Sequence, residues 1–153
     1  MKRMYLFTLE VVPLEVGKAY DALPSHLTLV SRFWSEKTPS QIAQAVEPLF
    51  GQTPPIALRF GTTTQLGPKQ LTVHIVEHSP EIKIAHNGIC DALDALGAEY
   101  EYPQFVREGH KPHVTQRQQM HFANGDKLVA KAAYLIEVVD RKRVVRQRFL
   151  LEG

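Results

Sequence analysis

The chain has one cysteine, one tryptophan and no long apolar run. Because Cys90 has no second cysteine to pair with, an internal disulfide is excluded and a reducing compartment is favoured. No apolar stretch approaches the ~20 residues of a membrane-spanning helix. The apolar stretch after the basic residues Lys2 and Arg3 is ended by Glu10, too early for a signal peptide. We therefore expect a cytoplasmic protein with no membrane partner.

Neither sign of charge dominates, with 18 Lys and Arg against 16 Asp and Glu. A composition of 44% hydrophobic and 22% charged residues excludes a disordered or collagen-like protein. The chain of 153 residues is long enough to fold around its own core without a metal or a disulfide. A pI near 8.7 permits a polyanionic partner without requiring one. We expect a single domain over residues 1–153.

Apolar periodicity and turn residues predict two helices interleaved with strands. The first helix has a capping box, in which Thr38 is the N-cap and Gln41 reaches back to it, and Gly51 is expected to close it. The second helix follows the N-cap Ser79 and ends at Gly97. Strands are predicted over Arg3–Val12, Ser25–Phe33, Ile56–Thr64, Gln70–Glu77, His113–Arg117, Ala132–Val139 and Val144–Leu150, with an extended segment at Tyr100–Val106 and a loop at Gln118–Lys127. This order favours an α+β fold with helices packed on a largely antiparallel sheet.

One tripeptide pattern, histidine–apolar–threonine, occurs twice, at residues 26–28 (HLT) and at residues 113–115 (HVT). Of the seven histidines, only these two are followed by an apolar residue and then by serine or threonine. Residues i and i+2 of a strand project from the same face, so each tripeptide presents an imidazole beside a hydroxyl. If the two strands meet across a cleft, two imidazoles and two hydroxyls converge on one small volume.

Such a group fits phosphodiester chemistry. An imidazole has an ordinary pKa of about 6.5, so it serves as base or acid near neutral pH. One neutral and one protonated imidazole take a proton from an attacking water and give one to a leaving oxygen. Threonine hydroxyls hold the non-bridging phosphate oxygens. We therefore take His26, Thr28, His113 and Thr115 as candidate catalytic residues acting on a strained diester, such as a 2′,3′-cyclic phosphate of RNA or a nucleotide, with no metal and no cofactor.

The paired motifs resemble the two-histidine (2H) phosphoesterase superfamily, which includes 2′-5′ RNA ligases and RNA cyclic phosphodiesterases. Pro112, directly before the second motif, is typical of its members. The resemblance implies two pseudo-twofold-related lobes of largely antiparallel sheet with packed helices around a central cleft, one motif in each lobe. It also implies metal-independent hydrolysis of cyclic phosphates or 2′-5′ linkages. Gln116 departs from the family pattern, which has an apolar residue there, and by alternation its side chain points toward a lobe core.

Several nearby residues have two interpretations. The alternative for the four motif residues is a packing role at strand ends. Arg117 continues the alternation of the second motif and either binds substrate phosphate or is an exposed arginine. For Arg32, which continues the first motif, an exposed position beyond the strand end is favoured. Phe33 and Trp34 either stack on a base or pack between the lobes.

The remaining histidines give no metal-ligand pattern. His74 and His78 are four apart, but their segment has strand character, and no thiolate cluster accompanies them. We expect His86 and His121 to be solvated, and Cys90 to be a buried helix residue. His110 and His113 are three apart, but the intervening Pro112 argues against a helix.

A basic cluster supports a competing hypothesis. It consists of Arg141, Lys142, Arg143, Arg146 and Arg148. These residues either attract RNA phosphates or protect an edge strand from pairing. In the first case the protein is a non-catalytic RNA- or nucleotide-binding module that uses its C-terminal hairpin. The sequence leaves open the substrate and which histidine is the base, and we expect a monomer.

Overall fold

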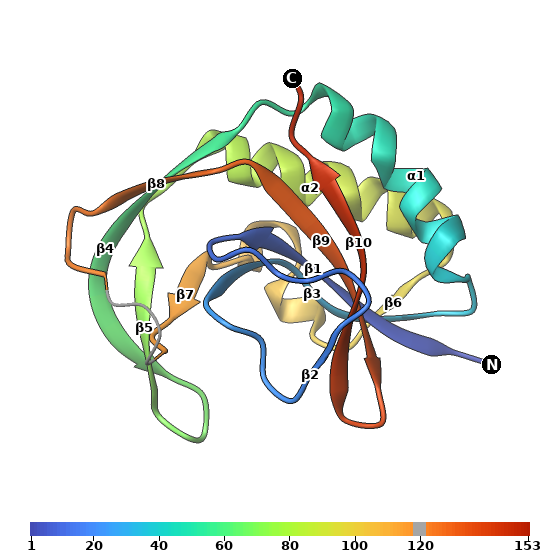
Figure 1. Cartoon of the computed structure of the whole chain (residues 1–153), viewed down its shortest axis with the longest axis horizontal. Helices are drawn as coiled ribbons and strands as arrows, with labels where there is room; N and C mark the ends of the chain where they lie inside the picture. Colours follow the sequence, from blue (N-terminus) through green and yellow to red (C-terminus); the bar gives the residue numbers. More distant parts are fainter. Residues whose placement is uncertain (118–121) are drawn as a thin grey trace.

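The computed structural model describes residues 1–117 and 122–153, and within them the chain has an α+β fold, as predicted. A mostly antiparallel sheet curls into an open half-barrel, and two helices pack on it (Figure 1). The strands are β1 (Arg3–Glu10), β2 (Ala19–Tyr20), β3 (His26–Ser35), β4 (Ile56–Leu66), β5 (Leu71–Val76), β6 (Glu99–Tyr100), β7 (His113–Thr115), β8 (Lys127–Ala130), β9 (Ala132–Val139) and β10 (Lys142–Leu150). The helices are α1 (Pro39–Gln52) and α2 (Pro80–Ala95).

The sheet order places the two motif strands side by side. The strands run β2-β10-β9-β1-β3-β7-β5-β4-β8, and β6 pairs with β3 beside this path. Thus β3 and β7, which are far apart in the sequence, are central neighbours. Each belongs to a different part of the sheet: β3 pairs with β1 on its other edge, and β7 with β5.

Both predicted helix starts are confirmed. Thr38 caps α1 and forms the full capping box with Gln41, and the Ser79 side chain accepts the backbone N–H of Ile82 at the start of α2. The first helix continues one residue past Gly51, to Gln52.

One expectation along the chain was wrong. The segment predicted as extended from Tyr100 to Val106 forms a strand only at Glu99–Tyr100 and then turns into 3₁₀-helices at Pro103–Phe105 and Arg107–Gly109. Pro103 supplies the fixed φ that suits the first of these turns. The predicted loop at Gln118–Lys127 includes residues 118–121, which lie outside the described residues, and residues 122–126, which form no strand or helix. A short strand that was not predicted, β8, begins at Lys127 and pairs with β4.

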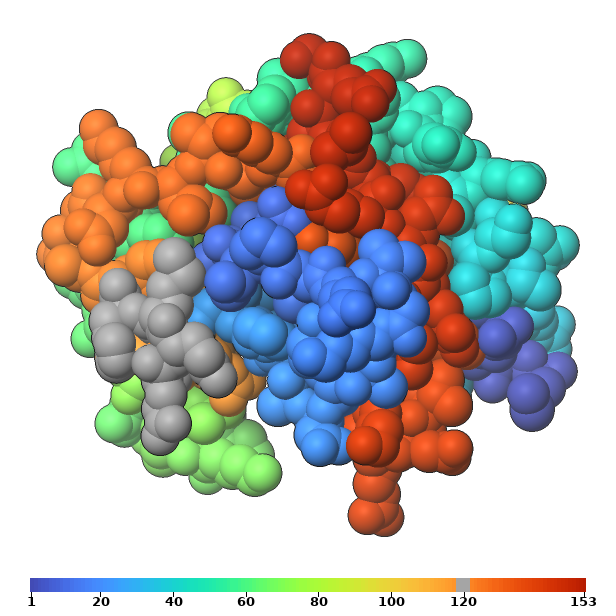
Figure 2. Space-filling view, viewed as in Figure 1, coloured from blue at the N-terminus to red at the C-terminus, as the bar shows by residue number. Residues whose placement is uncertain are grey.

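Apolar side chains lie on both faces of the sheet. The larger core lies between the sheet and the two helices. On the other face, a smaller cluster packs the segment between β1 and β3 onto the sheet, and it consists of Leu6, Leu14, Leu23, Tyr134, Ile136 and Val145. The space-filling view shows this segment in blue against the red β10 (Figure 2). Among the described residues, neither helix combines the length and apolarity needed to cross a bilayer.

Candidate functional site

The two histidine motifs meet in the pairing of β3 with β7. Leu27 lies opposite Val114 in this antiparallel pair, and both side chains are fully buried in the main core. Because residues on either side of an opposed pair are also opposed, His26 lies across from Thr115 and Thr28 across from His113. The motif histidines and threonines are partly exposed on the other face of the strands. The structure therefore brings all four predicted site residues to one small area.

Both motif histidines are held in the same way. The Nδ1 atom of His26 lies 2.9 Å from the carbonyl oxygen of Pro24, and Nδ1 of His113 lies 2.8 Å from that of Lys111. Each partner is the residue two positions earlier in the chain. A carbonyl oxygen only accepts hydrogen bonds, so Nδ1 of each ring donates and Nε2 is left for chemistry.

A cavity of about 710 Å³ opens over the motifs. Its lining includes His26, Thr28, His113 and Arg117. The surface is hollowed between the β4–β5 hairpin, in green, and the segment between β1 and β3, in blue (Figure 2). Thr115 lies beside the cavity and does not form part of its lining. The volume lies within the range of small-ligand sites, which is roughly 300–1,000 Å³.

Burial sets the protonation state of one motif histidine. It lowers the pKa of His26 to about 4, against the opposing effect of the hydrogen bond to Pro24. The positive charges of Arg117 and Arg143 and the proximity of His113 lower this pKa further. At neutral pH the His26 ring is therefore uncharged, and its Nε2 carries a free electron pair.

The arginines next to the motifs occupy different positions. Arg117 lines the cavity, and its buried Nε has no hydrogen-bond partner among the described residues. Arg32 was expected beyond the strand end, but β3 continues past it to Ser35. Its guanidinium binds the Glu101 carboxylate and donates to the Tyr102 hydroxyl, so it forms one wall of the cavity.

The basic cluster of the C-terminal hairpin is divided between ion pairs and the cavity. Arg146 pairs with Glu137, and Arg148 pairs with Glu10. Arg143 donates to backbone carbonyls and lines the cavity. The cluster is therefore no continuous basic surface, and one member belongs to the same site as the histidines.

Sequence reasoning missed several residues of the site. Lys69, at the β4–β5 turn, and Tyr102, after β6, line the cavity from segments with no motif of their own. Asp21 reaches it from the segment between β1 and β3. No periodicity in the sequence identifies these residues, because the folding of three separate loops brings them together.

One expectation about the remaining histidines was wrong, and another lies outside the described residues. His86 is fully buried rather than solvated, because α2 packs it against the β3 backbone, where Nδ1 lies 2.7 Å from the Leu29 carbonyl. His121 falls in the part of the chain that is not described. Cys90 is buried in α2, as predicted.

Burial distinguishes Phe33 from Trp34 and His74 from His78. Phe33 is fully buried and stacks on Tyr5 and Phe7 in the core, whereas Trp34 is partly exposed. His74 is buried with its ring edge-on to Phe60, far from the solvent that reaches His78. Across residues 1–117 and 122–153, no three histidine, cysteine, aspartate or glutamate side chains are grouped to hold a metal ion.

The chain matches the family model described as the 2′-5′ RNA ligase superfamily over residues 10–146. No curated protein matches it. Similar solved structures include a phosphoesterase, with a TM-score of 0.64 and 14% identity over the whole of both chains. Another is E. coli LigT in complex with NADP⁺, with a TM-score of 0.64 and 14% identity over 99% of this chain and 98% of LigT. A third is TT0787 of Thermus thermophilus, with a TM-score of 0.56 and 17% identity over 98% of each chain. At these identities the likeness shows a shared fold.

Proposed function

The chain belongs to the 2′-5′ RNA ligase superfamily, and on that premise we propose that it is a metal-independent phosphodiesterase that opens 2′,3′-cyclic phosphate or 2′-5′ phosphodiester bonds in RNA or nucleotides. Residues 1–153 act as one bilobal domain, with a motif from each lobe at the cleft. The proposed active form is a monomer, because both motifs come from the same chain. We place it in the cytoplasm, because the single cysteine favours a reducing compartment.

The register of β3 and β7 carries the proposal. Opposite residues of an antiparallel pair lie about 5 Å apart and diagonal ones about 7–8 Å apart. His26 and His113 are diagonal neighbours in this register. We infer that two rings at that separation, each with Nδ1 held by a carbonyl, act through their Nε2 atoms on a phosphorus bound between them in the cavity that both line.

The uncharged state of His26 assigns the two proton transfers in this proposal. Neutral His26 is the general base, and its Nε2 takes a proton from the attacking water as the water oxygen bonds to phosphorus. Protonated His113 is the general acid, and its Nε2 gives a proton to the leaving ribose oxygen as the P–O bond breaks. The product is a phosphate monoester.

The non-bridging oxygens of the phosphate gain negative charge in the transition state and need hydrogen-bond donors there. The Thr28 hydroxyl and the Arg117 guanidinium, both in the cavity lining, supply two of these, and the Thr115 hydroxyl, opposite His26 and beside the cavity, supplies a third. Lys69 and Arg143 lie farther around the cavity, where they attract the remaining charge of the substrate. Tyr102 offers an aromatic face to a base. Complexes of LigT with 3′-AMP and with NADP⁺, both phosphorylated nucleotides, are in keeping with this class of substrate.

Separate substitutions of the two motif histidines test the proposal. We expect His26→Ala and His113→Ala each to lower kcat on a 2′,3′-cyclic nucleotide by about 100- to 10,000-fold, because each removes one proton transfer. His78→Ala, at an exposed histidine away from the cavity, is the matched control. Activity is measured in EDTA, with folding checked by circular dichroism. Full activity in both motif variants would refute the proposal.

RNA binding through the C-terminal hairpin remains the second candidate, and Arg143 in the cavity wall is the observation that favours it. The ion pairs of Lys142, Arg146 and Arg148 weaken it, because they occupy three of the five cations. An inactive wild-type protein that binds RNA in a salt-dependent way, with His26→Ala binding equally well, would establish this candidate instead.

A further inference from the structure

One edge of β3 has a gap in its strand pairing that begins within the first motif, after Leu27. Along its other edge, β3 pairs with β1. On the edge in question it pairs with β7 at Leu27 and with β6 at Phe33 and Trp34. The backbone between these contacts includes Thr28 and Leu29, whose carbonyls meet side chains instead of a strand.

A β-bulge turns both carbonyls to this edge. In the pairing of β1 with β3, Phe7 lies opposite Val30 and Thr8 lies opposite Thr28, which leaves Leu29 as an extra residue. Successive carbonyls of a regular strand point to opposite edges, and a bulge interrupts that alternation. The first motif therefore lies beside an irregular stretch of strand that needs outside partners.

Two stacked imidazoles provide these partners. Nε2 of His110 lies 3.0 Å from the Thr28 carbonyl oxygen, and Nδ1 of His86 lies 2.7 Å from that of Leu29. Because carbonyls only accept, both rings donate. The two ring centroids are 4.1 Å apart, and the ring planes differ by 3°. The remaining nitrogen of His86, Nε2, accepts the backbone N–H of Arg107 at 2.7 Å.

Both rings are uncharged, which allows them to stack. Burial lowers the pKa of His110 to about 4 and also lowers the pKa of His86. Two imidazolium rings at this separation would repel each other, whereas two neutral ones pack like any flat aromatic pair.

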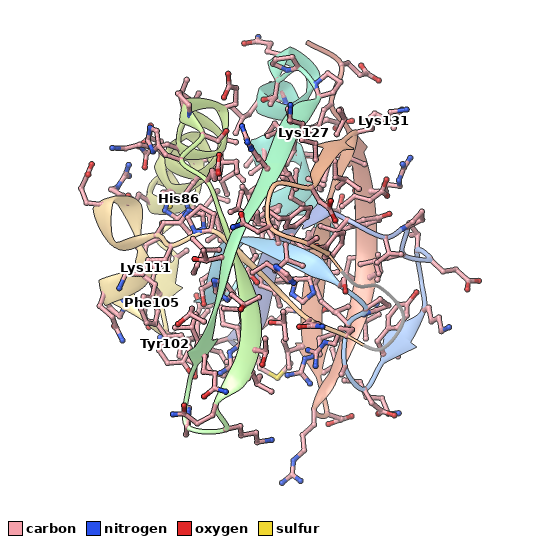
Figure 3. All side chains as sticks on the ribbon, turned by 90° about the vertical axis from the view of Figure 1, so that its left-hand side faces the viewer. His86, Tyr102, Phe105, Lys111, Lys127 and Lys131 are labelled. Carbon is pink, nitrogen blue, oxygen red and sulfur yellow. The ribbon has the colours of Figure 1, made fainter. Side chains whose placement is uncertain are left out.

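The imidazole pair connects both halves of the site. His86 belongs to α2, and His110 lies three residues before the second motif. Arg107 ties the same segment to α2 through ion pairs with Asp91 and Asp94. Figure 3 shows His86 between α2 and the sheet, with Tyr102, Phe105 and Lys111 on the segment beside it.

We propose that His86 and His110 are positioning residues, which hold the bulged backbone of β3 against the segment that leads into β7 and so fix His26 and Thr28 relative to His113. This inference rests on the proposed phosphodiesterase function. Neither residue lines the cavity over the motifs, so both act through the backbone.

Two substitutions of His110 separate its hydrogen bond from its bulk. His110→Phe keeps a flat ring but removes the donor to Thr28. His110→Gln removes the ring but restores an N–H donor at the end of a side chain of similar reach. Glu108→Gln is the control, because Glu108 lies on the same segment as His110 and pairs with Lys83 of α2.

The experiment measures kcat and KM on a 2′,3′-cyclic nucleotide and records the imidazole ¹H–¹⁵N spectra of His26 and His113. We expect His110→Phe to lower kcat by about 10- to 100-fold with little change in KM, because a small displacement of a reacting group has an effect of that size. The imidazole signals of both motif histidines shift in this variant. His110→Gln recovers most of kcat, and Glu108→Gln matches the wild type.

Two outcomes would overturn the inference: kcat and motif signals unchanged in His110→Phe, or equal losses in His110→Phe and His110→Gln. A wild-type protein inactive on every cyclic phosphate would instead refute the proposed function. In that case the imidazole spectra still decide the positioning role, since they require no turnover.

Discussion

The uncharged imidazole of His26 gives the site a base that works over a wide pH range. Its pKa lies near 4, chiefly through burial and in part through the positive charge of Arg117. Below that pH the ring is protonated and accepts no proton from water, so activity falls on the acidic side.

Removing the charge of Arg117 tests this electrostatic coupling. We expect Arg117→Met to raise the pKa of His26 and to move the acidic limb of the kcat/KM profile to higher pH. Burial remains the larger cause, so the limb stays below the ordinary histidine range. The pH dependence of kcat/KM reports the free enzyme's base and is the measurement to make. Arg141→Gln, outside the cavity lining, should leave the limb in place, and an unmoved limb in Arg117→Met would contradict the assignment of His26 as base.

Among the elements, the helix starts are specified locally, whereas the pairing of the two motif strands is not. The capping box of Thr38 and Gln41 is complete within four residues, which is why it was predictable. The short strand β7 has three residues, and its neighbours β3 and β5 define it more than its own composition does.

Substitution of the N-cap of α1 tests whether this local pattern stabilises the helix. We expect Thr38→Ala to lower the free energy of unfolding by about 1 kcal/mol, because the N–H of Gln41 loses its side-chain acceptor. Chemical denaturation measures the change, with Ser40→Ala in the exposed first turn as the control. Since no residue of α1 lines the cavity, kcat should be unchanged. An equal effect of both substitutions on stability would argue against the cap.

Over the whole molecule, buried neutral imidazoles make stability depend on pH. The pKa values of His26, His86 and His110 are all lower in the folded protein than the ordinary 6.5. The unfolded chain therefore binds more protons than the folded one as pH falls from about 6.5 toward 4, so folding stability is lost in that window.

Urea denaturation at pH 7 and pH 5 measures this loss. We expect a lower midpoint at pH 5, and a smaller difference in His110→Gln, which lacks one of the three groups. Ordinary carboxylates have pKa values of about 3.9 to 4.3 and titrate mostly below pH 5, so they contribute little to the comparison of pH 7 with pH 5. A midpoint that is equal or higher at pH 5 would contradict the burial of neutral rings.

The sequence by itself determined the helix starts, the α+β class and the four motif residues, because capping, periodicity and a repeated tripeptide are local patterns. The resemblance to the 2H phosphoesterase superfamily also depends on these four motif residues. Tertiary structure alone decided that β3 and β7 are neighbours, that Lys69 and Tyr102 join the cavity, and that His86 is buried. These facts depend on which distant segments meet when the sheet curls. The surroundings of a single residue depend on these long-range contacts, which the spacing of residues in the sequence does not reveal.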